Sequence, residues 1–236
     1  MKTMKNLLIV GAVALMASVS FSACNGSGSD GNGGGDKAAS IPTDGILGEL
    51  PKVVAEYEAA EAAADAKYKE LKESDPAKAD EFWKDYLHQG NATKFKKETL
   101  PAVSKTLEGK EIPTELAEGI PAKIEKNFTL DDKREASASF VFTAGASNDT
   151  PVLMYTSVAY DSDGNAIGTG RSISFSDYPI SEGKKFGAGF FISVSDYDAA
   201  QWAKLAKIVI MDRQSEAYKQ AEEQIKANKD AFKNKE

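Results

Sequence analysis

The hydrophobic period of this 236-residue sequence changes near Gly109, and the change separates two kinds of structure. Before Gly109, apolar residues recur at spacings of three and four, which is typical of amphipathic helices. After it, apolar residues alternate with small or polar ones, as they do in strands that bury one face. Because the two patterns occupy separate stretches, the sequence predicts an α+β fold.

The helical stretch, residues 47–109, is predicted to form an antiparallel hairpin. The first amphipathic stripe ends at Asp75 and Pro76, which suit a helix cap and the first turn of the next helix. The second helix is weakened near Gly90, resumes after it, and is bent at Pro101. Two helices joined by so short a turn pack side by side in opposite directions.

Residues 110–212 are predicted to form an antiparallel β-sandwich, because several short strand patterns follow one another with turn residues between them. One helical turn is expected at residues 198–204, before the last strand. The strand patterns cover residues 124–130, 140–143, 152–160, 173–175, 186–194 and 208–211.

One hairpin in this stretch carries a family resemblance. In residues 158–170, an apolar strand ends in Tyr160-Asp161, a turn ends in Gly164, and a second strand opens with an apolar residue and glycine. This pattern resembles the FxLYD-like immunoglobulin-type domains of bacterial exported proteins, over about residues 134–211. The resemblance implies an immunoglobulin-like sandwich that serves binding or structure, with no known reaction.

The last segment, residues 213–236, returns to a helical pattern with a thin apolar face made of Tyr218, Ala221, Ile225 and Phe232. A long isolated helix is marginal in water. We therefore predict that this C-terminal helix docks on another element, namely the N-terminal helical hairpin. The alternative is a helix that frays towards its end.

The start of the chain reads as an export signal. Two lysines precede an apolar run at residues 7–19, which has the length of a signal-peptide core and is too short to span a membrane. The run meets Phe21, Ser22, Ala23 and Cys24. Small residues before a cysteine resemble the lipobox of bacterial lipoproteins, with Phe21 in place of the usual leucine. The resemblance implies removal of the signal peptide and attachment of lipid to Cys24.

This interpretation sets the expected ends and location of the mature protein. Residues 1–23 are the signal peptide, and residues 24–46 form a lipidated flexible tether, because their glycine-rich composition offers little to bury. Cys24 is the only cysteine, so it cannot form an internal disulfide. We expect anchoring in the cell envelope, at the outer membrane, with the periplasmic or surface face left open. An ordinary secretory signal and a buried apolar helix are the alternatives.

The charge of the chain bears on its partners. The formal net charge is −7, and removal of the signal segment, which holds two lysines and no acids, makes it about −9. So acidic a chain has no electrostatic footprint for nucleic acid. The expected partners are the membrane, through lipid on Cys24, and a protein or a glycan, and no cofactor is expected.

Residue patterns typical of catalysis are weak. His88 is the only histidine, and its place near a helix end explains it without chemistry. The turn at Asp161 and Asp163 resembles the opening of a calcium loop, but an EF-hand requires glycine and glutamate where Ala166 and Ser172 stand. A hairpin turn accounts better for this segment, and a weak calcium site at Asp161–Gly164 stays open.

Three functions remain, in order of preference. The first is a non-catalytic envelope lipoprotein that acts as an interaction or scaffold module. The second is an accessory protein that binds carbohydrate or another small ligand, with Tyr178 and Tyr197 as the candidate contacts in predicted loops. The third is a hydrolase with paired carboxylates, which the 36 acidic residues allow but no motif marks.

Overall fold

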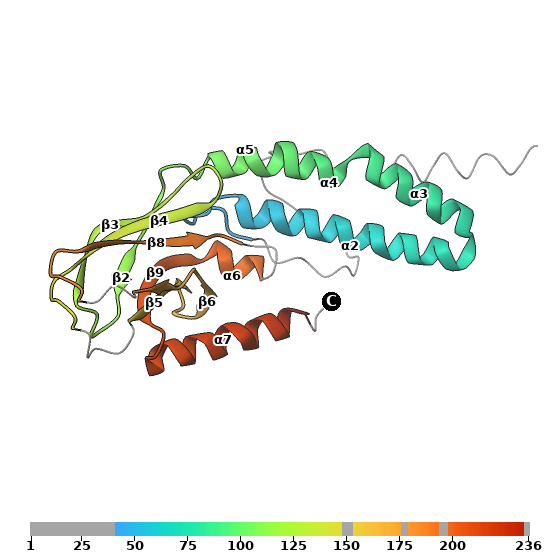
Figure 1. The fold of residues 1–236 in the computed structure, drawn as a ribbon. Coiled ribbons are helices and arrows are strands. Elements are labelled where there is room, and N and C mark those ends of the chain that lie inside the picture. Colours follow the sequence, from blue (N-terminus) through green and yellow to red (C-terminus); the bar gives the residue numbers. More distant parts are fainter. Residues whose placement is uncertain (1–40, 148–152, 176–178, 194–197, 234–236) are drawn as a thin grey trace, which may run out of the picture. The chain divides into compact units, whose positions relative to one another are not determined.

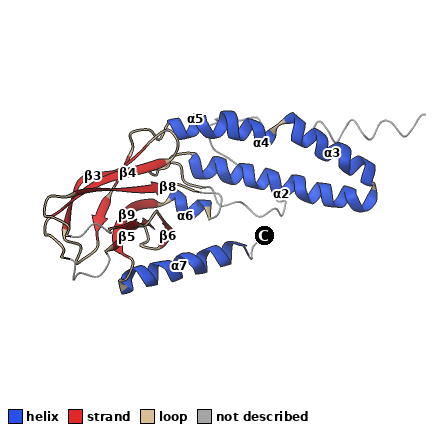
Figure 2. Cartoon of the chain, in the orientation of Figure 1, coloured by secondary structure: helices blue, strands red, loops and turns tan. Residues whose placement is uncertain are grey.

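The structure is a computed structural model, and its described part is an α+β fold, as the sequence predicts (Figure 1). Helices and strands occupy separate stretches, apart from one short helix before the last strand and a final helix after it (Figure 2). None of the described helices is both long and apolar enough to cross a bilayer. The described residues are 41–147, 153–175, 179–193 and 198–233, without the side chains of residues 88, 89, 91, 232 and 233.

The helical stretch begins and breaks at the residues that the sequence indicates. The Asp75 carboxylate accepts a hydrogen bond from the Lys78 backbone N–H at 3.3 Å, and Pro76 opens the next helix. Gly90 has a φ of 77°, which glycine adopts without strain, and ends that helix. The helical segments are α2 (Leu50–Ser74), α3 (Pro76–Gln89), α4 (Asn91–Lys94), the π-helix η1 (Phe95–Thr99) and α5 (Leu100–Lys105).

The two helical arms, α2 and α3 to α5, lie side by side and run in opposite directions. Near the far end Tyr68 contacts Trp83, with ring centroids 5.2 Å apart. Nearer the sheets Tyr57 stacks on Phe95 at 4.0 Å. Residue numbers thus fall along one arm as they rise along the other. Just before Pro101, where the sequence predicts a bend, five residues form the wider helical turn η1.

The strands form two sheets. The first has the order β1-β3-β4-β8 and is antiparallel throughout. The second has the order β2-β9-β5-β6, with β7 also paired to β5. The strands are β1 (Glu111–Ile112), β2 (Thr114–Leu116), β3 (Ala122–Leu130), β4 (Glu135–Phe142), β5 (Met154–Asp161), β6 (Ala166–Thr169), β7 (Ile173–Ser174), β8 (Lys185–Phe191) and β9 (Leu205–Asp212).

The second sheet differs from the antiparallel prediction in one pairing, because β2 runs parallel to β9, with Thr114 opposite Ile208. The sequence pattern shows no strand at β1 or β2, since two or three residues are too few to establish an alternation. The helical turn expected before the last strand is confirmed as α6 (Ala199–Ala203).

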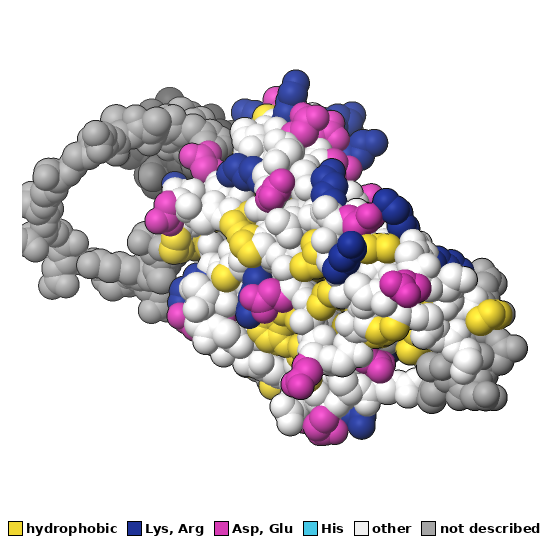
Figure 3. All heavy atoms as spheres, turned by 90° about the vertical axis from the view of Figure 1, so that its left-hand side faces the viewer, with side chains coloured by type: hydrophobic (Ala, Val, Ile, Leu, Met, Phe, Trp, Pro, Cys, Tyr) yellow, Lys and Arg dark blue, Asp and Glu magenta, His cyan; other side chains and the backbone are white. Residues whose placement is uncertain are grey.

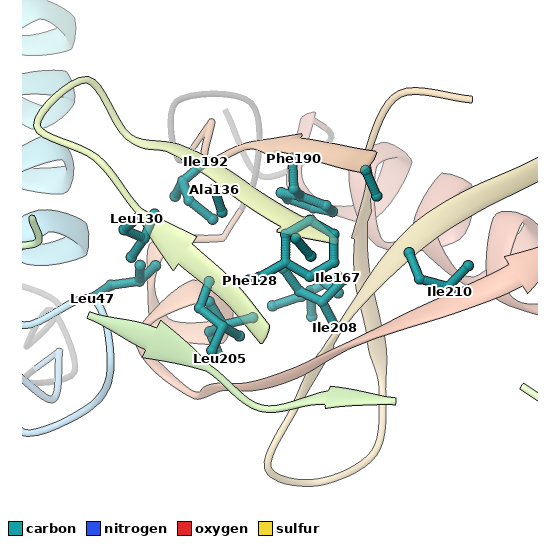
Figure 4. Close-up of a cluster of buried hydrophobic side chains, with 14 of the residues drawn as sticks. Leu47, Phe128, Leu130, Ala136, Ile167, Phe190, Ile192, Leu205, Ile208 and Ile210 are labelled. Carbon is teal, nitrogen blue, oxygen red and sulfur yellow. The ribbon is translucent and has the colours of Figure 1, made fainter. Parts of the chain in front are cut away.

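The main core contains side chains from both sheets and from the base of α2. The Phe142 ring from the first sheet lies 6.4 Å from the Tyr155 ring of the second. Trp202 of α6 is buried and lies 6.1 Å from Phe190. Leu47 joins the same cluster, in which the labelled side chains point towards one another between the strands (Figure 4). Burial of these large side chains supplies most of the stability of the fold.

The C-terminal helix, α7 (Glu216–Lys233), corrects one prediction. It packs on β6 and β9 of the second sheet and not on the helical arms, so docking on the hairpin is wrong. Tyr218, Ala221 and Ile225 form a buried cluster with Val158 and Val209, which lie on the face of this sheet away from the main core. The sheet needs this cover because β5 and β9 are apolar on both faces.

Candidate functional site

The sites that the sequence predicts lie largely outside the described residues. Cys24, Tyr178 and Tyr197 all fall there, so lipidation and the two ligand contacts stay predictions. His88 lies in α3, two residues before Gly90, and its side chain is not described. The described residues include no group of three or more metal-ligating side chains that could hold an ion.

The turn proposed as a weak calcium site is a hairpin turn between β5 and β6. The Asp161 carboxylate is buried and accepts hydrogen bonds from the backbone N–H groups of Asp163 and Asn165, at 3.0 and 2.8 Å. Asp163 pairs with Lys204 at 2.7 Å. Gly164 takes a φ of 85°, where other residues are strained. Both carboxylates therefore have structural partners, and the turn itself explains the Asp-Ser-Asp-Gly sequence.

The same turn holds the C-terminal helix. Gln224 of α7 accepts a hydrogen bond from the Ala166 N–H at 3.0 Å. Its side-chain N–H donates to the Asn165 side-chain oxygen at 3.1 Å. These bonds fasten α7 to the hairpin, and they explain why the turn is polar without a ligand.

A first candidate surface lies on the two helical arms. Beyond the base of α2, from residue 55 to residue 87, the only buried side chains are Ala64 and Ala79. Leu87 is 54 % exposed, which is unusual for a large apolar side chain among the described residues. The half-buried aromatic side chains between the arms are Tyr57, Tyr68, Phe82, Trp83, Tyr86 and Phe95.

A carboxylate lies among these rings. The Tyr86 hydroxyl donates a hydrogen bond to Glu61, and partial burial together with this bond raises the pKa of Tyr86 well above its usual value. Burial, with Glu61 nearby, also raises the pKa of Tyr57. The phenols therefore stay neutral at physiological pH, and the arms present uncharged aromatic side chains that are fixed by contacts with one another.

A second candidate site is a shallow cleft on the outer face of the first sheet, with a volume of about 170 Å³. Its floor contains Ser137 and Gly189, which are cross-strand partners on β4 and β8. The next cross-strand pair on the same face, Glu135 and Phe191, lies at one end. Arg171, which follows β6, completes one side. The lining residues are Asp131, Glu135, Ala136, Ser137, Arg171, Gly189, Phe190 and Phe191.

Arg134 fixes the aromatic end of this cleft. It has a φ of 69° in the turn between β3 and β4, a conformation that costs a residue other than glycine about 1 kcal/mol. The Arg134 guanidinium lies 5.0 Å from the centre of the Phe191 ring. A cation–π contact of this kind stabilises the folded state by about 0.5–1 kcal/mol. Burial lowers the pKa of Arg134, but an arginine keeps its charge at neutral pH. The Asp131 carboxylate anchors the turn by accepting hydrogen bonds from the Lys133 and Glu135 N–H groups.

Sequence reasoning misses this cleft because its residues come from three separate segments. The features that mark it are visible only in the structure, where Asp131 to Arg134 form a tight turn with arginine at a position that favours glycine. Phe191 is 45 % exposed although it belongs to an apolar strand pattern. Together, the strained arginine and the exposed phenylalanine identify this end of the cleft as unusual.

No protein-family model matches the chain, and no curated protein or solved structure is significantly similar to it. On the face seen in Figure 3, acidic and basic side chains are interspersed with scattered hydrophobic ones. That face presents no broad field of one sign to attract a strongly charged partner.

Proposed function

We propose that this protein is a non-catalytic cell-envelope lipoprotein, anchored to the outer membrane by lipid on Cys24, that acts as an interaction module. Its body is an immunoglobulin-like sandwich, and its helical hairpin is the contact surface for a protein partner. The lipid attachment rests on the signal-like segment before Cys24, and the partner surface rests on the helical arms.

The observation that carries this proposal is the thin interior of the arms. The 25 residues of α2 extend ~37 Å at the usual rise of a helix. Over the part beyond the base, Ala64 and Ala79 are the buried side chains, while the aromatic rings stay half exposed. Two helices usually bury such a stripe more completely against a third element. A partner that covers these rings and Leu87 would remove that apolar surface from water.

The chemistry of the arms specifies the partner. The Lys67 ammonium lies 5.0 Å from the centre of the Phe82 ring, and the Lys72 ammonium lies 5.3 Å from the centre of the Tyr68 ring. The rings lie among charged residues of both signs, so they fit a protein surface with an apolar centre and a mixed polar rim. Such a surface recognises aromatic side chains as anchors and charges at the rim.

The first part of the test concerns the anchor. Cells that produce the native chain or Cys24→Ser would be grown with an alkyne-labelled palmitate, and the protein would be followed in membrane fractions. We expect label and membrane retention in the native chain and neither in the variant. An unlabelled native chain would show that the anchor is wrong.

The second part concerns the arm. A photo-crosslinking amino acid would replace Leu87 in living cells, and Glu223, an exposed residue on α7, would serve as the matched control. We expect one discrete adduct from Leu87, weakened by Trp83→Ala, and none of that mass from Glu223. The same adducts from both positions, or none from Leu87, would refute the arm as the contact surface.

A further inference from the structure

We propose that the cleft on the outer face of the first sheet binds a single uncharged sugar ring, which stacks on Phe191 and exchanges hydrogen bonds with Glu135 and Arg171. This site does not involve the helical arms or Cys24. It therefore goes beyond the proposed function, and either proposal can fail without the other.

The size of the cleft sets the size of the ligand. Pockets that enclose drug-sized molecules have volumes of ~300–1,000 Å³, and this cleft has about 170 Å³. One six-membered ring with its hydroxyl groups fits that space. The floor is low because Gly189 carries no side chain and a Cβ placed there would meet no other atom within 4 Å. The space above Gly189 is therefore open to a ligand.

The charges around the cleft favour a neutral ligand. Asp131 and Glu135 bring two negative charges, and Arg134 and Arg171 bring two positive charges, so the rim is balanced. Neither Glu135 nor Arg171 forms an ion pair with another described residue. A phosphate or a strongly basic peptide would meet as much repulsion as attraction at such a rim.

The types of side chain favour a sugar among neutral ligands. A pyranose has an apolar face of C–H groups and a rim of hydroxyls, each of which both donates and accepts hydrogen bonds. Phe191 is partly exposed and lines the cleft, so its ring can contact the apolar face. The Glu135 carboxylate accepts from hydroxyls, the Arg171 guanidinium donates to them, and the Ser137 hydroxyl can do both.

The test uses the protein as purified from cells that produce the native chain, in an amine-oxide detergent, which has no sugar headgroup. The probes are methyl glycosides of the common neutral hexoses, pentoses and N-acetylhexosamines, with glucuronate as the charged comparison, observed by saturation-transfer NMR. We expect at least one neutral glycoside to receive saturation, strongest at its ring C–H protons. No transfer to any neutral glycoside, or transfer to glucuronate alone, would overturn the proposal.

Three variants locate the binding. Phe191→Ala removes the stacking ring and should weaken binding about tenfold. Gly189→Val fills the cleft and should abolish binding, although the new side chain meets no other atom of the protein at its Cβ. Gly187→Val is the matched control, because Gly187 lies on the same outward face of β8 but outside the cleft. Equal binding in Gly189→Val and Gly187→Val would overturn the site, and unchanged thermal midpoints would show that the variants are folded.

Discussion

The β-sheet body and the helical arms differ in how they bury side chains. In the body, large residues such as Phe142, Tyr155 and Trp202 are almost completely buried, and Phe142 contacts Tyr155 across the two sheets. In the arms, the buried side chains beyond the base are the alanines Ala64 and Ala79, and the large rings remain partly in water. The body therefore has a core that needs no further element to cover it, whereas the arms bury only small side chains between them.

This difference indicates which part of the molecule maintains the fold and which part is available for contact. Apolar burial contributes about 25 cal/mol for each Å² removed from water, so the body holds most of the folding free energy. Regions with little burial open locally at a lower free energy than the whole molecule. We therefore expect the arms to open while the body stays folded.

The largest effect is expected from Phe142→Ala. Phe142 is 1 % exposed and contacts the rings of Tyr155, Phe175 and Phe186. Its truncation leaves a cavity between the sheets and should lower the free energy of unfolding by about 3–5 kcal/mol. Trp83→Ala in the arms removes a half-exposed ring and should cost roughly 1–2 kcal/mol.

Hydrogen exchange read by mass spectrometry separates the two variants. Phe142→Ala should speed exchange in β4 and throughout the body. Trp83→Ala should speed exchange in α3 and leave β4 unchanged. If Trp83→Ala speeds exchange in β4 as much as in α3, the arms and the body form one cooperative unit and the comparison is wrong.

The second prediction asks whether α7 belongs to the body. Gln224→Ala removes the acceptor of the buried Ala166 N–H, and an unpaired buried donor costs about 1–3 kcal/mol. The matched control is Gln220→Ala, an exposed change on the same helix that should stay within about 0.5 kcal/mol. Urea unfolding measures both. If the two variants have equal stability, the clamp between α7 and the β5–β6 turn contributes nothing.

The sequence predicts those parts of the fold that depend on local preferences. The cap at Asp75, the break at Gly90 and the helical turn before the last strand all follow from residues that act within one turn. The position of α7 does not, because it depends on which distant surface is apolar. A signal was present: Ile208 to Met211 is a continuous apolar run, and such a run is typical of a strand buried on both faces. A strand of this kind needs a cover on each side.

The candidate site was less accessible to sequence reasoning. The cleft brings together the β3–β4 turn, the end of β8 and Arg171, which are separated by dozens of residues. The register between β4 and β8 sets Ser137 opposite Gly189, and the close approach of Gly170 to Gly189 brings Arg171 beside them. Register depends on the complete sheet, so no short motif reveals such a site.

The smallest effect is expected from Tyr86→Phe in the arms, and it depends on pH. The variant loses the hydrogen bond to Glu61, which is worth about 0.5–1.5 kcal/mol at a partly exposed position. Folding raises the pKa of the Tyr86 phenol above 10, so the unfolded chain ionises first as the pH rises. The stabilisation is therefore complete below about pH 10 and is lost above it.

Urea unfolding at about pH 8 and about pH 10.5 measures this effect. Between these two pH values the native chain should lose more unfolding free energy than Tyr86→Phe. Tyr218→Phe, which removes another phenol of raised pKa but on α7, is the control for a change outside the arms. If the alkaline loss of unfolding free energy is the same in the native and Tyr86→Phe chains, the Glu61–Tyr86 contact does not hold the arms together.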